Sequence, residues 1–314
     1  MNPYYNQNFF SFFKVLFGRL GSILSGDVLQ SDEIQIIVLA LVALSGAIIG
    51  AFLVLKRMTM IANSLSHTLL IGIAFVFWIS FHYGSEVSMT ALMIASLVMA
   101  FITVGLTRFL INVLNLKEDA ATGLVFTSLF SLGIIFVTLL TRSGHVGMES
   151  VVGNVDALVQ ADIQPVLIVA FLNVAIFTFL FKEFKLTSFD PLYARFLGFS
   201  PLFFDSVILA LTALTLISSF RAVGVIMVLC FLTAPVLSAR FFFKRLYSLI
   251  LYAGFIGVAT SIVAVALSRH LLSENNLAVS TSGLTVLLLA LVFLIHSQWF
   301  LFYRSIRRKS PRLT

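Results

Sequence analysis

The chain of 314 residues is 60% hydrophobic and only 11% charged, with a mean hydropathy of +1.08. Because a soluble domain is about 25% charged, this composition indicates an integral membrane protein and excludes a soluble enzyme, a nucleic-acid-binding module and a disulfide scaffold. The net charge of +7 is expected to reflect orientation in a membrane, and the single cysteine, Cys230, is expected to be a small buried hydrophobe.

The first 32 residues (1–32) are predicted to form an interfacial amphipathic segment. Their apolar run from Phe9 to Phe17 is interrupted by Lys14 and followed by Arg19. Such a mixture favours a helix that lies on the bilayer surface. A tenth span is the alternative, and it would move the N-terminus to the other side of the membrane.

Residues 33–304 are predicted to form an all-α, polytopic transmembrane domain. A helix needs about 20 mostly apolar residues to cross the hydrocarbon core, and nine stretches meet this requirement. They cover approximately residues 34–55, 58–81, 87–115, 121–141, 162–181, 202–219, 222–239, 246–268 and 283–303. The link between the sixth and seventh stretches, around Ser218–Arg221, is expected to be very short.

Lysine and arginine are divided unequally between the two sides that nine spans create. One set of loops holds only Arg142, Arg221 and Arg269. The side of the C-terminus holds fourteen of the twenty: Lys56, Arg57, Lys117, Lys182, Lys185, Arg195, Arg240, Lys244, Arg245, Arg304, Arg307, Arg308, Lys309 and Arg312. Because cytoplasmic loops are enriched in these residues, the C-terminus and its basic tail (305–314) are predicted inside and the N-terminus outside. Arg108, late in the third span, is expected to extend toward the same cytoplasmic face.

The second span carries the most polar side chains of any predicted span. Asn63 and His67 are four residues apart and therefore share one helix face, with Ser66 beside them. A neutral imidazole is a common transition-metal ligand, and an amide oxygen can add a weaker contact. The pattern predicts a transient metal site at His67 and Asn63, with Ser66 as a further candidate. The alternative is that these side chains only hydrogen-bond neighbouring helices together.

The remaining histidines are expected to be ordinary. His82 and His145 fall in predicted external loops, His270 lies near the outer end of a span, and His296 lies late in the last span.

The cytoplasmic stretch from Phe181 to Pro201 is predicted to contain a short helix near 188–199. Asp190 can cap this helix, Pro191 suits its first position, and Gly198 can end it. Phe189, Leu192 and Phe196 are expected to anchor the helix, while Glu183 and Arg195 face solvent. A short rigid helix between long spans suits docking to a cytoplasmic partner; a plain linker is the alternative.

Several catalytic signatures are absent from the sequence. It contains no HExxH motif, no CxxC pair and no Walker A glycine loop. Gly46–Gly50 (GAIIG) is typical of a face where membrane helices pack closely, not of a phosphate cradle. We therefore predict no catalytic residues and no permanently bound cofactor.

Four segments, in the same order, resemble the permease subunits of the ABC family that imports manganese, zinc and iron, the ABC-3 type of metal transporter permease. They are Gly46–Gly72 (GAIIGAFLVLKRMTMIANSLSHTLLIG), Lys117–Gly133 (KEDAATGLVFTSLFSLG), Phe184–Gly198 (FKLTSFDPLYARFLG) and Ala222–Arg240 (AVGVIMVLCFLTAPVLSAR). The resemblance runs from about residue 36 to residue 303. It implies a helical bundle like that of vitamin B12 and metal-chelate importers.

The resemblance also implies partners and roles. Such a permease dimerises with itself or with a sister permease, two cytoplasmic ATPase subunits dock on it, and an extracytoplasmic metal-binding protein delivers the ion. His67 matches the family's intramembrane histidine, whereas Asn63 stands where the family has aspartate. The helix with Glu183, Phe189, Asp190, Pro191, Arg195 and Gly198 matches the segment that couples to the ATPase. Ser280–Gly283 departs from a glycine turn that relatives often flank with proline.

Together these observations predict the permease subunit of an ATP-driven importer of Mn, Zn or Fe ions in the bacterial inner membrane, surrounded by the lipid bilayer. ATP hydrolysis is assigned to a separate subunit. A secondary transporter driven by ions and a membrane scaffold subunit are the alternatives. The sequence leaves the identity of the metal open, and likewise the choice between homodimer and heterodimer.

Overall fold

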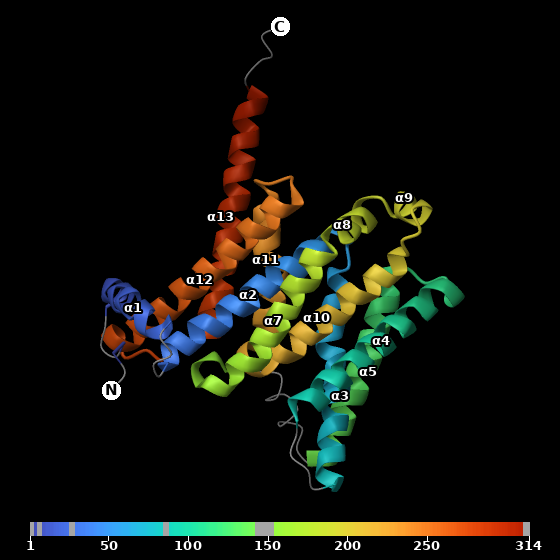
Figure 1. Cartoon of the computed structure of the whole chain (residues 1–314), viewed down its shortest axis with the longest axis horizontal. Coiled ribbons are helices and arrows are strands. Elements are labelled where there is room, and N and C mark those ends of the chain that lie inside the picture. The colour runs from blue at the N-terminus through green and yellow to red at the C-terminus, as the bar shows by residue number, and fades with distance from the viewer. Residues whose placement is uncertain (1–2, 5–7, 25–28, 84–87, 142–153, 310–314) are drawn as a thin grey trace.

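The computed structural model describes residues 3–4, 8–24, 29–83, 88–141 and 154–309, and this part of the chain is built from helices (Figure 1). In chain order they are α1 (Phe9–Leu24), α2 (Ser31–Leu55), α3 (Thr59–Tyr83), α4 (Met89–Leu114), α5 (Glu118–Thr141), the 3-10 turns η1 (Val155–Ala157) and η2 (Gln160–Asp162), α7 (Ile163–Phe179), α8 (Phe181–Phe189), α9 (Pro191–Phe196), α10 (Pro201–Val223), α11 (Val225–Arg240), α12 (Leu246–Asn275) and α13 (Thr281–Lys309).

The helices correspond to the nine predicted spans, so the all-α polytopic membrane fold is confirmed. In the described part of the chain, eight helices are long and apolar enough to cross a membrane, and α11 is a shorter apolar helix. The 16-residue α1 is not among the eight. The helix α13 continues to Lys309, past the boundary expected at residue 304.

The prediction of a link around Ser218–Arg221 is wrong, because these residues are helical and α10 continues to Val223. The chain breaks instead at Gly224, whose φ of +83° is a conformation that side-chain-bearing residues rarely adopt. One glycine thus ends α10 and starts α11.

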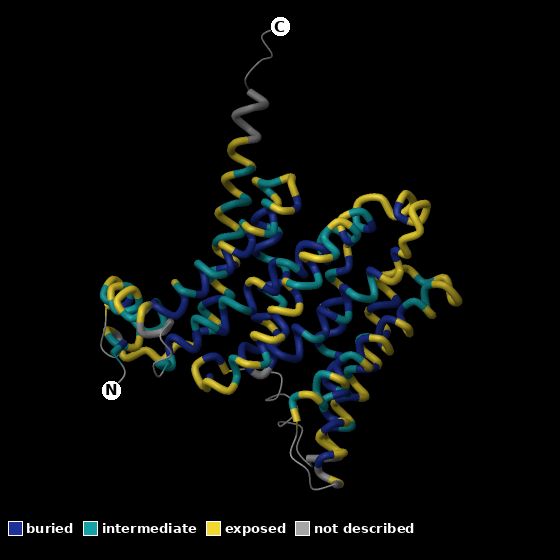
Figure 2. The backbone as a smooth tube through the Cα atoms, in the orientation of Figure 1, coloured by how far each residue is buried: buried dark blue, intermediate teal, exposed yellow. Residues whose placement is uncertain are grey.

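The spans form two groups that diverge in space (Figure 1). The helix α2 packs against α7, α10, α11 and α12, and α13 lies against α11 and α12; we call this group the main bundle. The helices α3, α4 and α5 pack mainly on one another and meet the main bundle chiefly through α10; we call them the limb. Buried residues concentrate inside the main bundle, whereas much of the limb is exposed (Figure 2).

Close backbone approach places α2 against α11. A Cβ atom on Gly50 would lie 1.9 Å from the carbonyl oxygen of Leu232, and one on Gly46 would lie 3.0 Å from that of Phe231. Gly46 and Gly50 therefore form a packing face, as the sequence predicted.

The helix α1 is fastened to the first turn of α2. The buried carboxylate of Glu33 accepts hydrogen bonds from the hydroxyl of Tyr4 at 2.9 Å and from Nε of Arg19 at 2.6 Å. Burial and the bond to Glu33 raise the pKa of the Tyr4 hydroxyl. Tyr4 and Phe12 are fully buried, and α1 packs on α12. This segment therefore has fixed contacts with the bundle, while its predicted placement at the membrane surface stays a prediction.

An aromatic cluster holds α8 on the main bundle. The ring of Phe184 lies 5.6 Å from that of Phe52 in α2, 4.7 Å from that of Phe177 in α7 and 5.2 Å from that of Phe204 in α10. Phe184 is fully buried. Because large aromatic side chains bury the most apolar area, this cluster fixes the direction in which α8 and α9 leave the bundle.

Candidate functional site

The polar residues of α3 lie in its first half. Asn63 is exposed and His67 is half-buried, whereas Ser66 is buried and its hydroxyl donates to the carbonyl oxygen of Asn63 at 2.6 Å. Asn63 and His67 therefore share an open face of α3, as their spacing predicts. The Ser66 hydroxyl is therefore already bonded within α3 and does not lie on the open face with the side chains of Asn63 and His67.

The imidazole of His67 rests against α5. Its ring centre lies 5.1 Å from that of Phe126 and 5.3 Å from that of Phe130. These contacts orient the ring without using its nitrogens. Among the described residues, the hydrogen bond that ties α3 to a neighbour runs from Thr103 to Thr68 at 3.0 Å, and the side chains of Asn63 and His67 take no part in one. Thr68 therefore acts as the polar link between helices, and His67 keeps its ligand atoms available.

A complete metal site is not assembled within the described residues, which contain no group of three or more His, Cys, Asp and Glu side chains that could hold an ion. Asn63 and His67 together supply one nitrogen and one oxygen. Transition metals in proteins usually take four or more ligands. Further ligands would have to come from water, from another molecule or from a second subunit.

The helix α9 has the ends that the sequence predicts. The carboxylate of Asp190 accepts from the backbone N–H of Tyr193 at 2.9 Å, and Pro191 occupies the first position. At the other end, Gly198 has φ +86°, and the N–H of Phe199 bonds the carbonyl oxygen of Ala194 at 2.9 Å. This pairing is a Schellman ending, which requires a residue that tolerates positive φ.

The surface of α9 differs from the expectation. Phe189, Leu192 and Phe196 were expected to anchor the helix, but their side chains are 58%, 69% and 89% exposed. The helix is held instead through Ala194, which is fully buried, and through α8. Arg195 faces solvent as expected, whereas Glu183 is half-buried and its Oε2 is a buried atom without a partner in the described structure. Phe189, Leu192 and Phe196 thus form an exposed apolar row along α9 and the end of α8, and this row is available for contact with another surface.

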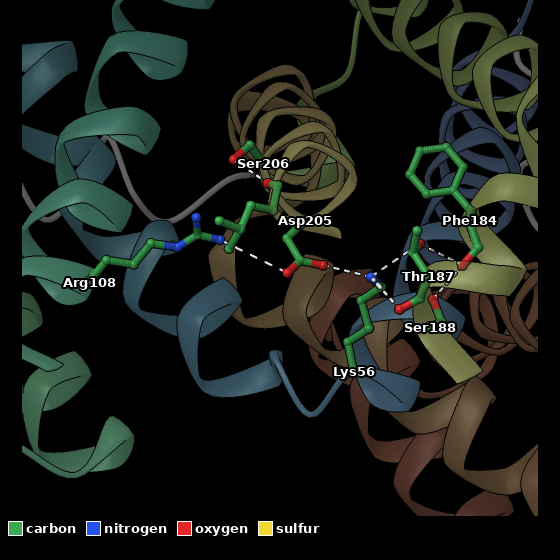
Figure 3. Close-up of polar contacts among 8 residues, drawn as sticks. Lys56, Arg108, Phe184, Thr187, Ser188, Asp205 and Ser206 are labelled. Atoms are coloured by element: carbon green, nitrogen blue, oxygen red, sulfur yellow. Dashed lines mark hydrogen bonds and ion pairs between the residues drawn. The ribbon is translucent and has the colours of Figure 1, made fainter. Parts of the chain in front are cut away.

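Behind α8 and α9, charged side chains from α2, α4 and α10 converge with the neutral Thr187 of α8 (Figure 3). The ammonium group of Lys56, at the end of α2, lies 2.6 Å from Oδ1 of Asp205 in α10. The same ammonium group donates to the carbonyl and hydroxyl oxygens of Thr187 in α8 at 3.5 Å. Arg108 of α4 lies 4.0 Å from Oδ2 of Asp205. A cavity of about 450 Å³ opens beside these residues and is also lined by Arg57, Glu118, Pro191 and Arg195.

The sequence did not single out this cluster, although it placed Lys56 and Arg108 on the same side. Asp205 is separated from Lys56 by 149 positions. The available signal was an acidic residue near the start of the predicted span 202–219, which holds no other charged residue, since such a residue is costly in a membrane unless it has a partner.

The opposite end of the bundle has its own polar contacts. Asp32 pairs with Arg269 of α12, with Nε at 2.7 Å from Oδ1. Asp156 of η1 accepts from the backbone N–H and the hydroxyl of Thr281, the first residue of α13. Asp156 thus caps α13 at the Ser280–Gly283 turn.

The remaining histidines were expected to be ordinary, but within the described residues the Nδ1 atoms of His270 and His296 are buried and have no hydrogen-bond partner. His82 is exposed at the end of α3 and stacks on Trp78, and His296 of α13 lies against Phe242. His270 is half-buried late in α12, and Cys230 is half-buried in α11. His145 and Arg142 lie outside the described residues.

Residues 34–300 match the family described as the ABC 3 transport family. A "Probable metal transport system membrane protein" of Chlamydia muridarum is 41% identical over 296 residues, covering 94% of this chain and 93% of that protein. The "Manganese transport system membrane protein MntD" of Bacillus subtilis is 34% identical over 239 residues, covering 71% of this chain and 78% of that protein.

Two solved structures share the fold. The structure of PsaBC from Streptococcus pneumoniae in complex with a Fab superposes with a TM-score of 0.72 at 22% identity, covering 88% of this chain and 95% of that one. An inward-facing putative metal-chelate type ABC transporter superposes with a TM-score of 0.59 at 19% identity, covering 87% and 89%. The fold is therefore that of ABC-importer permeases.

Proposed function

This chain belongs to the ABC 3 transport family, and from that premise we propose that it is the membrane permease subunit of an ATP-driven importer of divalent manganese, zinc or iron. The relatives named for metal and manganese transport favour a metal ion as the cargo. ATP hydrolysis belongs to separate cytoplasmic ATPase subunits, and a metal-binding protein delivers the ion on the outer side. The permease lies in the bacterial inner membrane.

The observation that carries the proposal is the open polar face of α3. An asparagine and an imidazole with free hydrogen-bonding atoms are expensive against lipid, because hydrocarbon offers them no partners. The exposed Asn63 and the half-exposed His67 therefore face an aqueous path or a second subunit. A dimer that pairs this face with a copy or a sister permease would surround the passing ion with ligands from both subunits.

The ligand chemistry suits transient binding of a passing metal ion better than tight, permanent binding. One imidazole and one neutral amide hold a dication weakly, and the missing carboxylate at position 63 removes a negative charge from the path. Weak binding allows release on the inner side. If a sister permease supplies the carboxylate, the heterodimer restores the charge that this chain lacks.

The exposed apolar row formed by α9 and the last residue of α8 is the proposed ATPase contact. Phe189 of α8 and Leu192 and Phe196 of α9 are exposed, and the loops on this side of the membrane are predicted to carry most Lys and Arg residues. We place this side in the cytoplasm, because cytoplasmic loops are the basic ones. Exposed apolar side chains beside Arg195 fit a groove on a soluble partner.

Replacement of His67 by alanine tests the metal path. We expect the uptake of manganese, zinc and iron into proteoliposomes with the full transporter to fall by roughly tenfold or more, because loss of even a residue that only orients a metal ligand costs about tenfold to a hundredfold. His82→Ala removes an imidazole from the outer end of the same helix and should leave uptake unchanged. Comparing the three ions identifies the cargo.

The amount of ATPase that co-purifies separates a transport defect from a folding defect. His67→Ala should retain its ATPase at the wild-type level, because the His67 ring packs on Phe126 and Phe130 of α5 and does not line the cavity beside α9. Normal uptake of every tested ion by His67→Ala would overturn the assignment of the path. A wild-type complex that takes up none of the three would overturn the proposed function itself.

A further inference from the structure

Asp205 lies where the main bundle meets the limb. It belongs to α10, the helix through which the limb is chiefly joined to the bundle. Its two carboxylate oxygens point to different partners: one to Lys56 at the end of α2, in the main bundle, and the other to Arg108 of α4, in the limb (Figure 3). A single carboxylate therefore bridges the two groups of helices.

The contact between Asp205 and Lys56 of the main bundle is short and largely buried. The side chain of Lys56 is only 8% exposed and lies 2.6 Å from Asp205. It also contacts Thr187, which is buried in α8. A buried ammonium group cannot lose its carboxylate without a large penalty. Lys56, Asp205 and Thr187 therefore tie α2, α10 and α8 into one unit, and α8 leads directly into α9.

The contact between Asp205 and Arg108 of the limb is long and partly exposed to solvent. The side chain of Arg108 is 34% exposed, and its guanidinium lies 4.0 Å from Asp205 at the edge of the 450 Å³ cavity. A solvent-accessible ion pair of this length contributes little to stability, so it can open and close during a transport cycle. Both side chains line the cavity, but Arg108 is the more exposed of the two, whereas Lys56 is held by Asp205 and Thr187.

The covalent link between the two groups borders the same cavity. The chain passes from α2 to α3 through Lys56, Arg57 and Met58, and Arg57 has a φ of +58°. The left-handed conformation makes this turn sharp. Beyond it, α3 carries Asn63 and His67. Movement of the limb at this turn would therefore move the two proposed metal ligands.

We propose that Asp205 and Arg108 are positioning residues that couple the ATPase contact to the metal path. A displacement of α9 passes through α8 and the Lys56–Asp205 unit, and the Asp205–Arg108 contact transfers it to the limb that carries His67. The inference rests on the proposed function, since it assumes that an ATPase moves α9. It adds the residues through which that movement reaches the ion.

Substitutions at Arg108 test the link. Arg108→Gln removes the charge at a partly exposed position, so the protein should fold normally. We expect the number of metal ions transported per ATP hydrolysed to fall by about three- to tenfold, a typical range for loss of coupling between sites, while ATP hydrolysis continues. Arg108→Lys keeps the charge and should recover most of the ratio. Lys117→Gln removes an exposed positive charge outside the cavity and should behave as wild type.

A distance measurement tests the same link without reference to metal. Paired labels are placed on cysteines that replace the exposed residues Val113 in α4 and Leu251 in α12, in a Cys230→Ala background. In the full transporter we expect the label distance to change when ATP and vanadate are added. Arg108→Gln should abolish most of this change, and Lys117→Gln should preserve it.

The outcomes are distinct. An unchanged coupling ratio together with an unchanged label movement in Arg108→Gln would overturn the inference. Equal loss in Arg108→Lys and Arg108→Gln would also overturn it, because the proposed link depends on charge. If the wild-type complex moves no metal but its label movement depends on Arg108, the proposed cargo fails and the link between α9 and the limb stands.

Discussion

Single residues decide how closely the helices approach one another, and Gly50 is the clearest case. The carbonyl oxygen of Leu232 occupies the space that a side chain at position 50 would need. Backbone cannot move aside as a flexible side chain can, so any larger residue must push α2 away from α11. Gly105 of α4 is also in a helix interior, but a Cβ atom added there would have no neighbouring atom within 4 Å.

We expect Gly50→Ala to destabilise the folded protein by about 1–3 kcal/mol, the usual cost of overpacking. Gly105→Ala should be neutral or stabilising by up to about 1 kcal/mol, because alanine favours helix over glycine. The midpoint of thermal unfolding in detergent would measure both. Equal midpoints for the two variants would contradict the close contact between α2 and α11.

Residues close in sequence were easier to predict than residues joined only by the fold. The face shared by Asn63 and His67 follows from a spacing of four in a helix. The bridge at Asp205 does not follow from any local pattern, because its partners come from α2 and α4. For the same reason the sequence assigned Arg108 to the membrane surface and missed its carboxylate partner.

At the scale of helices, the ends of α9 were predictable and its surface was not. Asp190, Pro191 and Gly198 act on the backbone next to them, so their types alone predict where the helix begins and ends. Whether Phe189 and Phe196 are covered depends on the position of α9 relative to the bundle. Both side chains are exposed, so they do not anchor the helix as expected and instead form part of an open surface.

The exposure of Phe196 leads to a prediction for assembly. Phe196→Ala should change the stability of the isolated permease by less than about 0.5 kcal/mol, since the side chain is 89% exposed. Its affinity for the ATPase should fall roughly thirtyfold, equivalent to about 2 kcal/mol for loss of an apolar anchor. Tyr247→Ala removes another exposed aromatic residue, in α12, and should retain the ATPase. Equal retention by both variants in a pull-down would contradict docking at α9.

The break between α10 and α11 shows a limit of sequence reasoning at this scale. Arg221 is a polar interruption, and it suggested a link near Ser218–Arg221. A helix can carry such a residue at its end, however, and it stops only where the backbone changes conformation. Gly224 supplies that change three residues later.

For the whole molecule, the distribution of Lys and Arg predicts which end faces the cytoplasm. Single cysteines at the exposed positions Gln160 and Lys117, in a Cys230→Ala background, test this orientation. A membrane-impermeant maleimide should label Gln160→Cys in intact spheroplasts and Lys117→Cys only after permeabilisation. The reverse pattern would place α9 outside and remove the proposed ATPase contact.

The short length of α11 has a consequence for the thickness of the hydrocarbon core beside it. Its 16 residues rise about 24 Å, whereas a hydrocarbon core measures about 30 Å. Its neighbour α10 has 23 residues and ends at the same Gly224, so of these two helices only α11 falls short of the core thickness. A hollow of about 460 Å³ lined by Ser218, Ala222 and Asp162 lies near the end of α10. A span shorter than the hydrocarbon core is accommodated by local thinning of the bilayer, among other means, and thinning beside α11 would shorten the apolar part of a cation's crossing.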